Sequence, residues 1–98
     1  MTIRKEAKDS KLNIALEGRL DTNTSPELEE ELKSSLEDVK ELVFDFTQLD
    51  YISSAGLRVL LAAQKKMNQQ GTMTVCNVND TVMEVFEVTG FADLLTIV

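Results

Sequence analysis

Two short segments hold the side chains whose types and spacing could do chemistry in this 98-residue chain. The first, residues 18–25 (GRLDTNTS), contains a run of short polar side chains: Asp21, Thr22, Asn23, Thr24 and Ser25. Such side chains commonly bond to nearby backbone in turns and helix caps, and this structural interpretation is favoured by residue type. The alternative interpretation makes Asp21 a surface carboxylate directed at a bound partner.

The second segment, residues 47–54 (TQLDYISS), ends in two serines that precede an apolar stretch. Serine is a preferred N-cap residue, so Ser54 is expected to begin a helix for structural reasons alone. Gly56 is less expected there, because glycine costs about 1 kcal/mol relative to alanine inside a helix. The glycine therefore predicts a close approach by another group at this position.

The composition excludes several kinds of site. Histidine is absent, so a histidine-based triad, proton shuttle or metal ligand cannot form, and one cysteine excludes an internal disulfide and a thiolate zinc cluster. No glycine-rich phosphate loop is found, and no serine stands beside a plausible general base. We therefore expect no catalytic residues, no metal and no cofactor.

The charge balance bears on partners and location. Ten basic against seventeen acidic residues give a net charge of −7, which argues against nucleic acid and against an anionic membrane surface. No apolar run approaches the roughly 20 residues needed to cross a bilayer, and no signal peptide is recognised. A cytoplasmic location is expected.

The elements that must position the two segments are read from hydrophobic spacing. It predicts strands over residues 2–7, 11–17, 41–46 and 72–78, helices over residues 26–37, 54–69 and 81–89, and a last strand or terminal helix from residue 94. Strands alternating with helices predict one α/β domain over residues 1–98, with parallel crossovers and functional loops at the carboxyl ends of the strands.

Several local features refine this prediction. Pro26 suits the first position of a helix whose stripe is Leu28, Leu32 and Leu36. The nearly continuous apolar run in residues 41–46 predicts a strand buried on both faces. Thr81 and Glu84 have capping-box spacing, Gly90 is placed to end that helix in a left-handed conformation, and Cys76 is expected in the core.

The apolar opening of the helix over residues 54–69 spans more than one stripe. A helix of this kind is normally covered on more than one side. Leu57 is accordingly either a core residue or a partly exposed contact for a partner.

Residues 50–61 (DYISSAGLRVLL) closely resemble the signature of the STAS domain, specifically that of the stand-alone anti-sigma factor antagonists of bacteria. Residues 18–21 (GRLD) and 85–91 (VFEVTGF) are similar to two further segments of that family, in the expected order. The resemblance covers nearly all of the chain. It implies a four- to five-stranded mixed sheet with helices mainly on one side.

The same resemblance implies a function without catalysis. The unphosphorylated protein would bind an anti-sigma factor that is also a serine kinase, and would thereby release the sigma factor. Phosphorylation would switch it off, with Ser54 as the implied acceptor and Ser53 as a rival, and a serine phosphatase would reverse the modification. The implied partner-binding residues are Asp21, Thr22, Asn23, Ser53, Ala55, Gly56, Leu57 and Arg58.

Three positions depart from the common pattern of the family. Ser53 stands where many members have aspartate, Ala55 where serine or threonine is usual, and Arg58 where glycine is frequent. These departures leave the Ser54 acceptor in place. The alternative function is a STAS interaction module of another assembly, such as a stress-signalling or lipid-transport complex, without a sigma factor.

Overall fold

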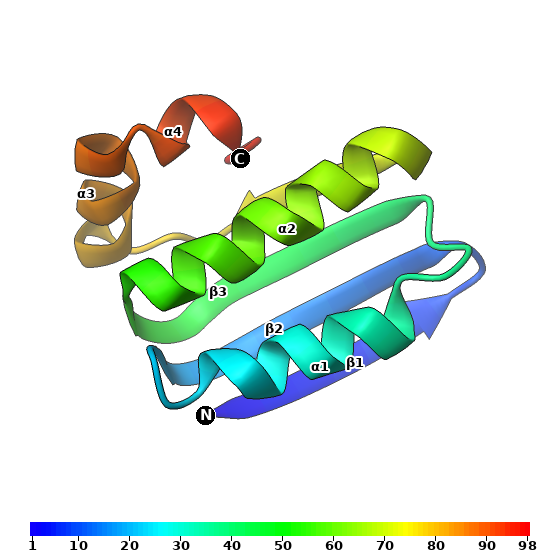
Figure 1. The fold of residues 1–98 in the computed structure, drawn as a ribbon, viewed down its shortest axis with the longest axis horizontal. Coiled ribbons are helices and arrows are strands. Elements are labelled where there is room, and N and C mark those ends of the chain that lie inside the picture. The colour runs from blue at the N-terminus through cyan, green and yellow to red at the C-terminus, as the bar shows by residue number, and fades with distance from the viewer.

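A four-stranded mixed sheet carries four helices on one of its faces in the computed structural model, which describes residues 1–98 (Figure 1). The elements follow in the order β1 (Thr2–Lys8), β2 (Lys11–Leu20), α1 (Ser25–Ser35), β3 (Glu41–Ile52), α2 (Ser54–Gln70), β4 (Thr72–Cys76), α3 (Asp80–Thr89) and α4 (Phe91–Leu94). Strand order is β1-β2-β3-β4, with an antiparallel first pair and parallel pairs thereafter. The expected mixed sheet with helices on one side is confirmed.

The last residues of the chain were expected to form a strand or a terminal helix from residue 94. They form neither a full strand nor a terminal helix, because α4 ends at Leu94 and the chain then turns to β4. Ile97 makes an isolated parallel bridge with Val75, and the Val98 amide donates to the Val75 carbonyl at 3.0 Å. This short segment occupies a fifth position at the β4 edge of the sheet.

The core lies between the sheet and the helices. Alternate residues of the two central strands are fully buried on the helix side, among them Ile14 and Leu16 of β2 and Phe44 and Phe46 of β3. The predicted stripe of α1 is confirmed, since all three of its leucines are buried: Leu28, Leu32 and Leu36. α2 contributes the most buried positions of any helix, which agrees with its broad apolar opening.

The other face of the sheet has no helix, and two predictions fail for this reason. Val43 and Asp45 of β3 are only half-buried, so the strand is not covered on both faces. Cys76 lies beside them on the same face and is half-buried instead of in the core. Partial burial raises the pKa of its thiol, and the nearby Asp45 charge raises it further, so the thiolate is disfavoured.

Both central strands are longer than the sequence indicates, and the polar segments begin later than expected. β2 continues past Gly18 to Leu20, and β3 continues to Ile52. Two register shifts interrupt their pairing, one between Ala15 and Glu17 and one between Gly18 and Arg19. At each shift β3 has one extra residue, which changes the face to which the following side chains point. The hydrophobic alternation is therefore lost over residues 47–52, and the sequence alone predicts a loop there.

Specific bonds hold these irregular positions. Gly18 has a φ of 103°, a backbone conformation that favours glycine, and it lets β2 bend at the shift instead of ending there. In β3 the Asp45 carboxylate accepts bonds from the hydroxyl and the backbone amide of Thr47 and from the Asn77 side-chain amide. These bonds lower the pKa of Asp45, with the Thr47 hydroxyl as the largest cause.

The helix ends follow the expectations in part. Gly90 ends α3 with a φ of 83°, as predicted, and Pro26 occupies the first turn of α1. The capping box is wrong, because the N-cap of α3 is Asn79, whose side-chain oxygen accepts from the Val82 amide at 2.8 Å. A side-chain carbonyl two residues before Thr81 satisfies the free amide of the first turn.

The close approach expected at Gly56 is internal to the protein. A Cβ atom there would lie 2.7 Å from Cγ of Leu20 and 2.9 Å from Cγ1 of Ile52, both fully buried residues at the strand ends. The glycine thus lets α2 lie directly on the ends of β2 and β3. No approach by a partner is needed to explain it.

We expect Gly56→Ala to destabilise the protein. Overpacking costs about 1–3 kcal/mol, and alanine regains about 1 kcal/mol of helix propensity, so the net loss of unfolding free energy is up to about 2 kcal/mol. Urea unfolding measures it. Ala62→Gly, at an exposed site of the same helix, is the control that isolates the propensity effect; a stabilised Gly56→Ala protein would contradict the packing argument.

Candidate functional site

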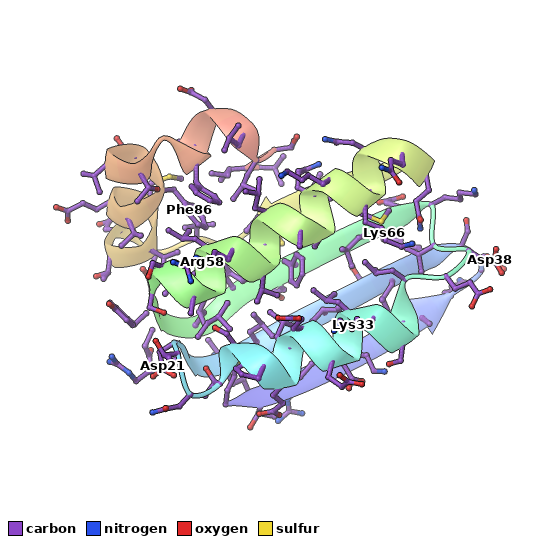
Figure 2. The ribbon with its side chains drawn as sticks, in the orientation of Figure 1. Asp21, Lys33, Asp38, Arg58, Lys66 and Phe86 are labelled. Atoms are coloured by element: carbon purple, nitrogen blue, oxygen red, sulfur yellow. The ribbon has the colours of Figure 1, made fainter.

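The ends of β2 and β3 bring the two polar segments together. The Ser53 amide donates to the Leu20 carbonyl at 2.9 Å, and Arg19 pairs with Tyr51 in the ladder. The Arg19 guanidinium also lies 4.4 Å from the centroid of the Tyr51 ring, a cation–π contact. Figure 2 shows Asp21 and Arg58 at the same end of the molecule, opposite the end that carries Asp38.

The Asp21 carboxylate organises its own loop. Oδ1 accepts from the amides of Asn23 at 3.0 Å and Thr24 at 3.1 Å, while Oδ2 lies 3.6 Å from Nε of Arg19. Partial burial raises the pKa of Asp21, but the bonds from Thr24 and Asn23 and the Arg19 charge outweigh it, and the pKa is lowered. The turn-and-cap interpretation of Asp21 therefore has direct structural support.

Thr24 completes the loop. It is the N-cap of α1 but makes no side-chain bond to that helix. Its hydroxyl accepts from the Asp21 amide at 2.9 Å and donates to the Arg19 carbonyl at 2.7 Å. The loop is therefore closed onto the end of β2, and it leaves Thr22 and Asn23 exposed at its tip.

The two serines occupy different environments. Ser53, and not Ser54 as expected, is the N-cap of α2, because the Ser53 backbone is still extended and bonded to β2. Its hydroxyl is buried and has no hydrogen-bond partner. Ser54 is the first residue of the helix, and its side chain is exposed.

The residues after Ser54 divide between core and surface. Leu57 is only 4% exposed, so of the two alternatives the core residue is confirmed and the partly exposed contact is wrong. It points to the interior together with Gly56, whereas Ala55 is half-buried and Arg58 is exposed. The surface of this helix end is thus formed by Ser54, Ala55 and Arg58.

Three residues that shape the site were missed by sequence reasoning. Arg19 and Tyr51 are paired across the strands, which only the register reveals. Asn79 caps α3 and also donates from its amide to the Leu49 carbonyl at 2.8 Å, so it fixes the end of β3 to the next loop. Asn79 and Asp80 directly precede a segment with helical hydrophobic spacing, and this pattern could have identified the cap.

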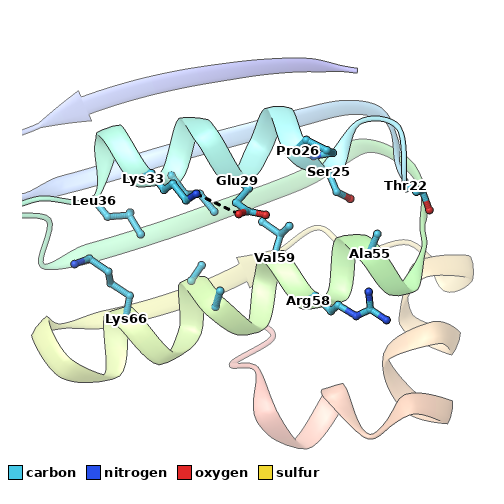
Figure 3. Close-up of a pocket in the computed structure, with 13 residues that line it drawn as sticks. Thr22, Ser25, Pro26, Glu29, Lys33, Leu36, Ala55, Arg58, Val59 and Lys66 are labelled. Atoms are coloured by element: carbon cyan, nitrogen blue, oxygen red, sulfur yellow. Dashed lines mark ion pairs between the residues drawn. The ribbon is translucent and has the colours of Figure 1, made fainter.

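A groove adjoins the site between α1 and α2 (Figure 3). Its volume is about 540 Å³, and Thr22, Ala55 and Arg58 line the end next to Ser54. No group of acidic or cysteine side chains has the arrangement to hold a metal ion. None of the helices combines the length and apolar character that crossing a membrane requires.

Comparison with known proteins identifies relatives of this chain. Residues 2–98 match the STAS domain. BtrV of Bordetella bronchiseptica, named as an anti-sigma factor antagonist, is 37% identical over 91 residues, which are 91% of this chain and 78% of BtrV. The anti-sigma-B factor antagonist of Listeria monocytogenes is 32% identical over 97 residues, which cover 95% of this chain and 83% of that protein.

Solved structures agree. An anti-sigma factor antagonist from Mycobacterium paratuberculosis has a TM-score of 0.88 at 23% identity, covering 98% of this chain and 83% of its own. The Bacillus protein SpoIIAA in its phosphorylated form has a TM-score of 0.77 at 18% identity, covering 99% and 91%. The fold and site define a small α/β module built around one helix N-terminus. The chain belongs to the STAS domain family.

Leu57→Ala tests the assignment of Leu57 to the core. Truncating a buried leucine costs about 2–5 kcal/mol, so the melting temperature should fall by roughly 10–40 degrees. Leu94→Ala is the matched control, because Leu94 is 54% exposed and its truncation should change the melting temperature little. Equal effects of the two substitutions would refute a core role for Leu57.

The Asp21 loop predicts a pH dependence. Because the folded-state pKa is below the ordinary value of 3.8, the ionised carboxylate stabilises the fold fully above that pH. The stabilisation is lost as the pH falls through the folded-state pKa. Asp21→Asn should therefore be less stable than the wild type at pH 7, and the difference should shrink in acid.

Denaturant unfolding of both proteins between neutral and acidic pH measures this difference. Asp50→Asn is the control, because Asp50 is exposed and makes no side-chain hydrogen bond or ion pair. A difference for Asp21→Asn that stays constant with pH would show that the loop does not depend on the ionised carboxylate.

Proposed function

We propose that this protein is an anti-sigma factor antagonist that acts by binding. In its unphosphorylated form it binds an anti-sigma factor with serine kinase activity, and the sigma factor is released. The observation that carries the proposal is the exposed Ser54 at the start of α2, beside the ordered loop of Asp21. The names of the relatives at 37% and 32% identity support the same partner class.

Ser54 is the acceptor in this proposal, and Ser53 is the rival. A kinase must bring the hydroxyl into its own active site, which an exposed side chain allows and a buried one resists. The Ser54 side chain is exposed, whereas the Ser53 hydroxyl is enclosed. The accessibility of the two hydroxyls thus supports Ser54.

The helix N-terminus tolerates the modification. The amides of Ser54, Ala55 and Gly56 make no bond outside the helix, and the first-turn amides of a helix have no partner within it. A phosphoryl group there would meet the positive end of the helix dipole. The phosphorylated protein should therefore keep its fold, as the fold of phosphorylated SpoIIAA, a protein of similar architecture, is kept.

The proposed contact surface combines the tip of the first loop with the start of α2. Thr22, Asn23, Ser54 and Arg58 are exposed there, and Ala55 is half-buried among them. Asp21 orders the loop and offers Oδ2 to a partner. Gly56 and Leu57 are buried beneath this surface and support it, and Leu57 makes no direct contact with the partner.

Phosphorylation would change the charge of this surface without changing its frame. It adds about −1.5 to −2 charges and three strongly hydrated oxygens. A partner shaped for the free hydroxyl must desolvate or displace that group. A penalty of roughly 3 kcal/mol weakens binding more than a hundredfold, enough to release the partner, and a serine phosphatase would restore it. A sigma-factor pathway places these events in the cytoplasm.

The test uses the protein, the kinase and ATP. Ser54→Ala should bind the kinase but take no phosphate, and Ser54→Asp should fold normally and bind at least tenfold more weakly, a loss of about 1.4 kcal/mol or more. Mass spectrometry of the treated wild type should find phosphate on Ser54. Calorimetric titration gives the affinities.

Ser53→Ala is the matched control. It removes a buried hydroxyl without a partner, so the protein should fold at least as well and remain a full substrate. Phosphate on Ser53 with Ser54 unmodified would refute the assignment. Tight binding of Ser54→Asp would refute the switch, and failure to bind any sigma-regulating kinase would favour a STAS module of another assembly.

A further inference from the structure

The groove between α1 and α2 has an apolar floor. Leu32 of α1 and Leu36, which directly follows that helix, line the groove with Val59 and Ala63 of α2, and all four are buried. Ala62 lines the same groove and is exposed, so the floor is reached from solvent. Figure 3 shows Ala55 and Val59 on the side of α2 that faces α1, where their small side chains leave space between the two helices.

The charge of the groove is opposite to that of the protein. Its lining has three basic side chains and one acidic side chain, in a chain of net charge −7. The acidic one, Glu29, is paired with Lys33 at 3.4 Å. Arg58 and Lys66 take part in none of the ion pairs of the structure. Two cations therefore line an apolar surface without a partner.

The spacing of these cations sets the size of an occupant. Arg58, Ala62 and Lys66 follow one another at intervals of one turn, so the two charges are about 12 Å apart along the helix axis. The groove extends along α2 from Ala55 to Lys66, about 16 Å or three helical turns. Small-molecule sites usually enclose most of their ligand, whereas this groove is open along one side.

We propose that the groove is a docking site for an acidic amphipathic helix of a partner protein. The helix would place apolar side chains against Ala55 and Ala62, above the buried floor, and carboxylates two turns apart would pair with Arg58 and Lys66. A third helix seated between two others is an ordinary packing arrangement, and small residues at the contact allow close approach.

The net negative charge of the protein does not oppose this contact. Charges beyond about 8 Å are largely screened at physiological ionic strength, and the one carboxylate in the lining, Glu29, is paired with Lys33, which leaves Arg58 and Lys66 to attract an acidic helix. The proposal goes beyond the Ser54 switch, because the occupant need not be the kinase. Thr22, Ala55 and Arg58 belong to both surfaces, but peptide binding is measured without the kinase, so the groove can be tested apart from the switch.

The probe is an alanine-rich helical peptide of about 18 residues, long enough to be partly helical alone. One face has leucines, and glutamates two turns apart flank them; its two controls replace the glutamates by glutamine or by lysine. Titration into isotope-labelled protein should shift the amide signals of groove residues. The glutamate peptide should bind several-fold more tightly than the glutamine peptide, and the lysine peptide most weakly.

Two neighbouring lysines give the decisive comparison. Lys66 lines the groove, whereas the adjacent Lys65 is exposed and does not line it. Lys66→Gln should weaken binding of the glutamate peptide about two- to fivefold, the upper part of the range for one surface ion pair, and Arg58→Gln should do the same. Lys65→Gln changes the net charge equally and should alter binding less than twofold. Ala62→Phe should fill the groove and abolish binding while leaving the melting temperature within a few degrees.

Three outcomes would overturn the proposal. The first is no shift of groove signals by the glutamate peptide up to about 1 mM, at which even weak docking is visible. The second is an equal effect of Lys65→Gln and Lys66→Gln, which would reduce the binding to general charge attraction. The third is saturable binding of laurate, with the same dependence on Lys66 and no binding of peptide, which would make the occupant a fatty acid. None of these results depends on the kinase.

Discussion

The Ser53 amide donates to the Leu20 carbonyl, and this bond joins the last residues of the β2–β3 ladder to the start of α2. The parallel pairing brings the carboxyl ends of both strands to one edge, so the loop of Asp21 and the first turn of α2 meet there. The two register shifts set which residue at the end of β3 lies opposite the end of β2. Accessible Ser54 and enclosed Ser53 both follow from this one pairing.

Packing beneath the helix reinforces the same geometry. Gly56 lies against Leu20 and Ile52, the last residues of the two strands, and Leu57 enters the core beside it. The helix N-terminus is therefore fixed by the sheet and not by its own cap, since the Ser53 hydroxyl makes no capping bond. A rigid frame of this kind allows a charge added at Ser54 to change the surface without moving it.

Much of this arrangement follows from periodicity that one sequence displays. The leucine stripe of α1, the alternation in β2 and the αL end at Gly90 all depend on local spacing, and the fold class follows from their order. The STAS signature in residues 50–61 identified the family, which the match over residues 2–98 confirms. These features depend on residues that are close in the sequence, so they can be predicted without knowledge of tertiary contacts.

What failed depends on contacts between distant residues. The bulges that lengthen β3 are visible only against β2, and the exposed face of Cys76 and Val43 depends on which side the helices cover. The choice between core and surface for Leu57 depends on the rotation of α2 against the sheet. Asn79 was passed over because its bonds to Val82 and Leu49 combine a local cap with a contact thirty residues away.

The strand β1 has a further consequence for how this protein meets others. Its residues pair with β2 on one side only, and from Arg4 onward all are exposed, with charged side chains at most positions. Charged edge strands resist the addition of another strand, and at the opposite edge the Thr96–Val98 segment already occupies part of β4. Growth of the sheet from chain to chain is therefore discouraged at both edges. At high concentration the molecule should remain free of edge-to-edge assembly, and recognition is left to side chains of its helices and of the loop before α1.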